Sequence, residues 1–395
     1  MKMMKHMRFL LRVKRDSPFF RLLRIAWSIS IFILIGLATS GCKRVKKGQI
    51  EIGALLPLTG SGANYGEYAK NGIELAVYEI NHAGGVKGQN LVVLYEDSQS
   101  NPSTGVSGFR KLLDVNKVPA TLIEFSPVVM ACAPIANDNK SVLLNCGAQT
   151  PKVREAGPFV FSAIPDANQE AVQMADFAYG QLGLREVSTF CINTETGIAT
   201  TEIFVKHFNK LGGKIIVKKR HDQGGGDYRP QLTSLKAMMP PGIYMISLTR
   251  ESALILKQAS EIGLKTQWLS YTSFQGIDIL TVAKNAAEGA IYTYPKFEPS
   301  LSRKAADFES AYKRRYSKAP EVYAATFYDG TYALRAAMEK VGLLGEDVQQ
   351  GLRTIVYQGI AGPIDFRKST WVDKPLQFRT VRDGQFVAFQ ISAVH

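Results

Sequence analysis

Residues 50–90 read IEIGALLPLTGSGANYGEYAKNGIELAVYEINHAGGVKGQN, and their pattern indicates the fold class of the chain. Its first apolar run, 52–58, has the length of a buried strand, and a Gly-rich turn at 59–62 ends it. Small or apolar side chains then recur every three or four residues from 65 to 80, which predicts a helix that stops at Gly84-Gly85. A second apolar run, 91–95, completes a strand–loop–helix–strand unit. Such a unit predicts an α/β fold with a ligand near the first loop.

The same alternation continues along most of the chain. Strand-like runs alternate with helical patterns as far as about residue 295, which predicts mostly parallel sheets flanked by helices. Helix starts are marked by Asn101-Pro102, Ser126-Pro127 and Asp166. Two long helical patterns (302–316 and 322–341) and a strand pair near 378–390 follow. The two sets of strands and helices predict two lobes joined by several chain crossings.

The bulk composition is that of a folded protein with room for two domains. The chain has 395 residues, of which 46% are hydrophobic and 21% charged. Half of the net charge of +14 comes from residues 1–41, which hold eight basic side chains and one acidic one. The rest shows neither a basic cluster nor an aromatic platform, so no nucleic-acid partner is expected.

The N-terminus has the pattern of a targeting segment. A basic region, 1–24, precedes an uncharged apolar stretch, 25–37, and the small residues 38–41 lead to Cys42. This order predicts a lipoprotein signal peptide over 1–41, a lipid attached to Cys42 and a tether over 42–49. An uncleaved membrane anchor is the alternative. In both cases the folded part would be exported and would lie outside the cytoplasmic membrane.

The other side chains with chemical potential are scattered. Cys132, Cys146 and Cys191 form no CxxC and no Cys/His spacing, so no metal is expected. Cys132 and Cys146 could form a disulfide in an exported protein, or all three could be buried thiols. The five His are dispersed, neither HExxH nor GxSxG occurs, and the glycines at 224–226 lack the Lys of a phosphate loop. We therefore expect no enzyme, no catalytic residue and no cofactor.

Several segments resemble one known family in its own order along the chain. They are the opening stretch, DSQSNPSTGVSGFRKLL, APIANDNKSVLLNCGAQTP, LKQASEIGLKTQWL, AAEGAIYTYP and YAATFYDGTYALRAAME. Together they resemble bacterial type I solute-binding proteins of the branched-chain amino acid (Leu/Ile/Val-binding) group. The resemblance implies a two-lobe clamshell, with lobe 1 at 50–165 plus 296–375 and lobe 2 at 166–295 plus 376–395. It also implies that a ligand closes the cleft and that an ABC permease receives the loaded protein.

The resemblance also implies a half-site in the first lobe. In members that bind α-amino acids, a Ser at a helix start and a small-x-Thr loop hold the carboxylate. Those positions are Ser126 and the loop Gly147-Ala148-Gln149, while Tyr65 and Tyr323 match aromatic wall positions. Each has a plainer interpretation: helix capping for Ser126 and core packing for the two tyrosines.

The second half-site departs from the family pattern. Thr196 replaces the tyrosine of a Tyr-Gly pair, Leu248 replaces an aromatic residue, and Thr272 replaces the acid that neutralises an ammonium. A buried ammonium without a carboxylate is costly, unless Glu124 supplies the charge from lobe 1. Glu124 is otherwise a surface carboxylate at a strand end. We therefore expect a ligand other than a standard α-amino acid: an aromatic or aliphatic carboxylate, an amide or a urea-like compound.

Two kinds of partner for the ligand-bound receptor stay open. The expected function is that of an extracytoplasmic receptor for an ABC-type uptake system. The alternative is a ligand-sensing receptor that feeds a regulator or sensor kinase rather than a permease.

Overall fold

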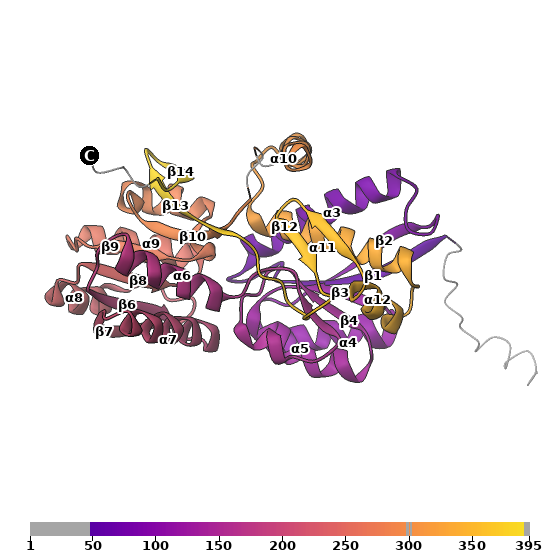
Figure 1. The fold of residues 1–395 in the computed structure, drawn as a ribbon, viewed down its shortest axis with the longest axis horizontal. Helices are drawn as coiled ribbons and strands as arrows, with labels where there is room; N and C mark the ends of the chain where they lie inside the picture. Colours follow the sequence, from indigo (N-terminus) through magenta and orange to yellow (C-terminus); the bar gives the residue numbers. More distant parts are fainter. Residues whose placement is uncertain (1–47, 298–299, 301, 391–395) are drawn as a thin grey trace, which may run out of the picture. The chain divides into compact units, whose positions relative to one another are not determined.

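The computed structural model describes residues 48–297, 300 and 302–390 (Figure 1). From Ile50 onward the chain forms one compact unit. The expected signal peptide 1–41, the lipid site Cys42 and most of the tether 42–49 lie outside the described residues. Within the described ranges, no helix combines the length and the apolar character needed to cross a membrane.

The first sheet has five strands in the order β2-β1-β3-β4-β5. Strands β1, β3, β4 and β5 run parallel, as the strand–helix alternation predicts. The strands are β1 (Gln49–Leu56), β2 (Asn90–Asp97), β3 (Ala120–Ile123), β4 (Val142–Asn145) and β5 (Val160–Ser162). The helical elements between them are α3 (Ala63–His82), α4 (Pro102–Arg110), η1 (Lys111–Val115), α5 (Ser126–Asp138) and η2 (Pro151–Glu155).

The second sheet has seven strands in the order β14-β13-β10-β9-β8-β6-β7. It is parallel apart from β13 and β14, which are antiparallel to their neighbours. The strands are β6 (Glu186–Ile192), β7 (Lys214–His221), β8 (Gly242–Ile246), β9 (Gln267–Ser270), β10 (Ile291–Pro295), β13 (Leu376–Arg382) and β14 (Gln385–Ala388). The helical elements are α6 (Ala167–Gly180), α7 (Glu195–Lys210), α8 (Arg229–Met238), α9 (Thr249–Glu261), η3 (Thr272–Phe274), η4 (Ile279–Ala283) and η5 (Lys284–Ala287).

The segment between β10 and β13 packs on the first sheet. Helix α11 lies along α3, and α12 contacts β4. The elements are α10 (Arg303–Tyr316), α11 (Val322–Lys340), α12 (Gly345–Leu352) and the hairpin β11 (Val356–Gly359) with β12 (Gly362–Asp365). Gly72 permits the close approach of α3 and α11, because a Cβ there would collide with the carbonyl of Ala324.

Helices cover both faces of each sheet. In β1, Ile52, Ala54 and Leu56 pack on the side of α3 and α11, whereas Leu55 packs on the side of α4 and α5. Figure 1 shows these helix pairs on opposite sides of the strands. In the second sheet, α6 and α7 pack on one face and α8 and α9 on the other. The predicted α/β architecture is confirmed.

Capping residues set the helix starts that the sequence marks. Oδ1 of Asn101 accepts from Ser103 N at 2.9 Å, and Oδ1 of Asp166 accepts from Asn168 N at 3.1 Å. At the end of α3, Gly85 has a positive φ of 75° and its N–H donates to Ile80 O at 2.8 Å.

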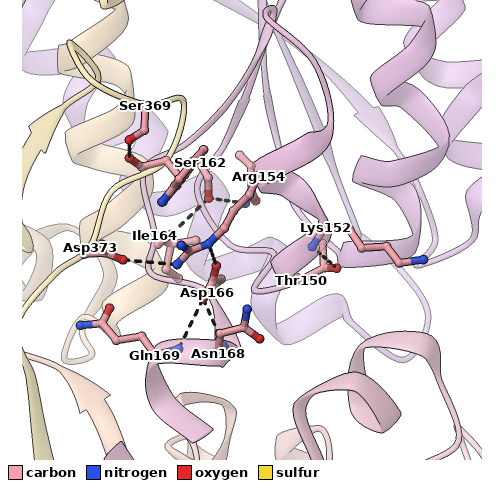
Figure 2. Close-up of polar contacts among 12 residues, drawn as sticks. Thr150, Lys152, Arg154, Ser162, Ile164, Asp166, Asn168, Gln169, Ser369 and Asp373 are labelled. Atoms are coloured by element: carbon pink, nitrogen blue, oxygen red, sulfur yellow. Dashed lines mark hydrogen bonds and ion pairs between the residues drawn. The ribbon is translucent and has the colours of Figure 1, made fainter. Parts of the chain in front are cut away.

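Chain crossings lie next to one another between the two sheets. Ser162 N donates to Thr370 O, and Val372 N donates back to Ser162 O. Figure 2 shows Arg154 between two carboxylates, Asp166 at the start of α6 and Asp373, whose Oδ1 is 3.4 Å away. Arg154 therefore ties two crossing segments together. The lobe boundaries near 165, 295 and 375 remain predictions.

The disulfide that could join Cys132 and Cys146 is not formed, and both are buried free thiols, as is Cys191. Cys132 packs with α4 and α5, whereas Cys146 packs on the other face of the sheet against Gly330 of α11. Successive strand residues face opposite sides, so Cys146 follows Val142 and Leu144 away from Cys132.

Candidate functional site

The described chain contains a cavity of about 80 Å³ at the carboxyl ends of strands from both sheets. Parallel α/β sheets place ligands at this edge. Loops after β3, β4, β6, β7, β8 and β9 contribute, together with α3 and α11. The lining residues are Tyr65, Glu124, Phe125, Ser126, Pro127, Gly147, Ala148, Gln149, Ile192, Thr194, Thr196, Gly197, Gln223, Leu248, Tyr271, Ser273 and Tyr323.

Most residues expected at the site lie on this wall. They are Tyr65, Glu124, Ser126, Gly147, Ala148, Gln149, Thr196 and Tyr323. Thr272 is the exception: it is buried but does not line the cavity. Nine lining residues were not proposed as ligand contacts, among them Phe125, Gln223, Tyr271 and Ser273. A position directly after a strand of a parallel sheet is the sequence signal that could have found Tyr271 and Ser273.

The polar groups of Thr272 bind Glu170 of α6 instead of facing the cavity. Thr272 N donates to Oε2 at 2.9 Å, and its hydroxyl donates at 2.8 Å. Thr293 and the amide of Gln149 donate to the same carboxyl group. Burial raises the pKa of Glu170 to about 7, although these hydrogen bonds oppose the rise. The side-chain amide of Gln149 therefore donates to Glu170. It does not take over the role of the Thr hydroxyl that the small-x-Thr loop would offer to a ligand.

The expected anion-binding loop has its donors occupied. Asn145 Oδ1 accepts from Gly147 N at 3.2 Å and from Ala148 N at 2.7 Å. Gly147 and Ala148 both line the cavity, but their backbone N–H groups donate to Asn145 and not to the cavity. A ligand carboxylate at this loop would have to break these two hydrogen bonds.

Ser126 is the first residue of α5 rather than its cap. The capping position is Phe125, which makes no side-chain hydrogen bond. Within the described residues, no hydrogen bond of the Ser126 hydroxyl is found, so the capping interpretation is wrong. The hydroxyl is free to meet a ligand in the cavity that it lines.

Two tyrosines of the wall reach across to loops of the second sheet. The Tyr65 hydroxyl accepts from Thr249 N at 2.9 Å and lies 2.8 Å from Thr249 Oγ1. The Tyr323 hydroxyl lies 3.0 Å from Ser273 Oγ. The Tyr323 ring contacts the Tyr65 ring edge-on, with 5.2 Å between the ring centroids. Burial raises the pKa of Tyr65 to about 12. These side chains are both packed in the core and part of the cavity wall.

Glu124 is the carboxyl group of the wall. It is only 3% exposed, and its Oε2 has no hydrogen-bond partner in the described chain. Burial raises its pKa to about 8. Glu124 is thus a buried pocket residue and not a surface carboxylate at a strand end.

A serine–histidine contact occurs elsewhere in the second sheet. Ser247 Oγ lies 3.0 Å from His221 Nε2 and donates to Glu251 Oε2 at 3.0 Å. All three side chains are buried and none lines the cavity. Glu251 also accepts from Gly224 N at 2.6 Å, so the group holds the loop after β7 in place. Among the described residues, no group of His, Cys, Asp or Glu is arranged to hold a metal ion.

A model of the periplasmic binding protein family matches residues 49–385. Leu/Ile/Val-binding protein homolog 1 of Brucella suis is 24% identical over 304 residues, which cover 74% of this chain and 79% of the relative. The leucine-, isoleucine-, valine-, threonine- and alanine-binding protein of Pseudomonas aeruginosa is 22% identical over 339 residues, 85% of this chain and 90% of the relative.

Solved structures share the fold over most of both chains. A branched-chain amino acid transporter substrate-binding protein from Streptococcus pneumoniae, in complex with isoleucine, has a TM-score of 0.81 and 22% identity, covering 86% of this chain and 98% of that one. A solute-binding protein from R. palustris, in complex with benzoate, has a TM-score of 0.79 and 19% identity, covering 86% and 95%.

Proposed function

Because the chain belongs to the periplasmic binding protein family, we propose that it is an exported receptor that binds a small solute in this cavity for an ABC-type uptake system. The observation that carries the proposal is the cavity itself, which is enclosed by loops from both sheets at the carboxyl ends of their strands. Pockets of this kind bury most of a small ligand.

Polar contacts across the cavity support a closing motion. Ser61 accepts from Gln223 at 3.0 Å, and Tyr65 and Tyr323 bind Thr249 and Ser273. In this proposal the first sheet, with α10 to α12, and the second sheet form two lobes. A ligand that touches both walls favours the state in which these contacts are made, because it binds that state more tightly.

The ligand of this proposal is not a standard α-amino acid. The carboxylate of an α-amino acid would meet the amides of Gly147 and Ala148, which already donate to Asn145. The lining residues from the second sheet include no carboxylate that could neutralise the ammonium group. Glu124 lies beside Gly147, next to the loop where the carboxylate of an amino acid would bind. Leucine at millimolar concentration should therefore raise the melting temperature by less than about one degree, whereas a tight ligand stabilises by several.

Lipid attachment at Cys42 belongs to the same proposal and would keep the receptor at the membrane after export. The basic tether at 43–47 adds attraction to anionic headgroups. Metabolic labelling with a radioactive fatty acid tests this part: Cys42→Ala should abolish incorporation, and labelling of the variant would contradict it.

A thermal-shift screen of amino acids, carboxylates, amides, ureas and amines tests receptor function. A ligand should raise the melting temperature by several degrees, and Ser126→Ala should remove the shift while leaving the protein folded. Ser300→Ala, outside the cavity, serves as the control. A screen without any stabilising compound, or a shift that Ser126→Ala leaves unchanged, would contradict binding at this site.

A further inference from the structure

Glu124 lines the cavity, and its Oε2 is a buried acceptor without a hydrogen-bond partner within the described chain. Leaving such an atom unpaired costs free energy, and buried polar groups in native proteins nearly always have a partner. A carboxyl group that lines a cavity and makes no hydrogen bond to the protein is suited to a ligand that brings a donor.

The backbone around Glu124 is shaped to keep the carboxyl group in place. Gly147 leaves the space that it needs, because a Cβ there would come within 2.6 Å of Glu124 Oε1. The next residue, Phe125, has φ 75° and ψ 110°, a conformation that non-glycine residues rarely adopt. Strained residues of this kind cluster at binding sites, where the surrounding structure maintains them.

The cavity wall has an acidic side chain, Glu124, but no basic one. Its other lining residues include three tyrosines (Tyr65, Tyr271 and Tyr323) but neither Lys, Arg nor His. An ionised Glu124 would therefore have no cationic side chain beside it in the cavity. A carboxylate and aromatic rings without a basic side chain are complementary to a cation.

The groups that face Glu124 from neighbouring elements are Tyr65 of α3, Tyr323 of α11 and Cys146 after β4. Burial raises the pKa of each, so none is charged at neutral pH. Burial also raises the pKa of Glu124 to about 8, so the carboxyl group is mostly protonated at neutral pH when the cavity is empty. A bound cation favours the ionised form and releases that proton.

We infer that the ligand is a small organic cation with N–H donors, of the amidinium, guanidinium or alkylammonium type, and that Glu124 binds its charged group. This inference rests on the proposed receptor function and replaces the carboxylate, amide or urea-like ligand expected from the sequence. The cavity of about 80 Å³ is small, which limits the size of the cation.

Two series of equal shape and different charge test the inference by isothermal titration of the purified protein. Acetamidinium, acetamide and acetate form the smaller series, and benzamidinium, benzamide and benzoate form the larger one. The cation of one series or both should bind at least about 100-fold more tightly than its neutral and anionic counterparts, as expected for a buried charge pair. Near pH 7 its binding should release close to one proton, seen as a difference in heat between phosphate and Tris buffers.

Glu124→Gln keeps the size of the side chain and removes its ability to ionise. It should weaken cation binding by about 100-fold or more and abolish proton release, while circular dichroism shows a folded protein. Glu202→Gln is the control, because it makes the same replacement at an exposed ion pair with Lys218 away from the cavity. It should leave both readouts unchanged.

Other outcomes overturn the inference. Tighter binding of the amide or the carboxylate, no binding of either amidinium, or equal binding by the wild type and Glu124→Gln would each exclude the cation. The proposed receptor function would survive these results if the thermal-shift screen finds another ligand that depends on Ser126. The proposed receptor function itself is contradicted when the thermal-shift screen finds no stabilising compound.

Discussion

At the scale of single residues, three glutamates have a strongly raised pKa: Glu124 in the cavity wall, Glu170 bound to Thr272 and Glu321 before α11. Burial raises the pKa of Glu124 to about 8 and those of Glu170 and Glu321 to about 7. Glu170 and Glu321 accept hydrogen bonds, which oppose the rise, but Glu124 accepts none. Glu124 is thus the group whose ionisation the empty protein opposes most.

These shifts predict how stability depends on pH. Each carboxyl group holds its proton more tightly in the folded state, so the folded protein binds more protons than the unfolded one between about pH 4.5 and pH 8. The free energy of unfolding should therefore fall as the pH rises through this window, by up to about 1.4 kcal/mol per pH unit for each group. Urea unfolding at several pH values measures it. Glu124→Gln should flatten the slope, and an unchanged slope would contradict the burial of Glu124.

The positions of the site residues could be anticipated only through the family resemblance. A strand end followed by Ser-Pro marks a helix start, but it does not reveal that Glu124 two residues earlier is buried. The partner of Thr272 is Glu170, 102 residues away in the sequence, and the partner of Tyr65 is Thr249, 184 residues away. Contacts of this range depend on tertiary structure, which local patterns do not encode.

At the scale of elements, α3 and α11 pack against each other and cover one face of the first sheet. Gly72 lies at the point of closest approach to Ala324. Gly72→Ala should lower the free energy of unfolding by about 2–3 kcal/mol, because the added methyl group forces the helices apart. Gly180→Ala, at the end of α6, is the control: a Cβ there meets nothing within 4 Å. Equal effects of the two changes in urea unfolding would contradict this packing.

The elements of the strand–helix alternation could be predicted because their apolar periodicity is regular. Helix α12 and the hairpin of β11 and β12 were not predicted. Each of those strands has four residues, most of its side chains are not buried, and Pro363 interrupts β12. Short strands of this kind carry neither alternation nor a continuous apolar run, so pattern reading overlooks them.

At the scale of the whole molecule, the contact between Tyr65 and Thr249 joins the sides of the cavity. Tyr65→Phe removes the hydroxyl that pairs with Thr249 N and Oγ1 and leaves these groups without that partner. Ligand affinity in isothermal titration should fall by about tenfold while the fold is kept. Tyr78→Phe, at an exposed position of the same helix, should leave affinity unchanged. An effect from Tyr78→Phe alone, or from neither, would contradict the closing role.

The most direct test of cation binding in this cavity is a crystal structure of the protein with the compound that stabilises it most in the thermal-shift screen. We expect electron density for that compound inside the cavity, with an N–H donor within hydrogen-bond distance of Glu124 and the hydroxyl of Ser126 in contact. Density for an α-amino acid there, with its carboxylate bound to Gly147 and Ala148, would contradict it, as would a compound bound elsewhere.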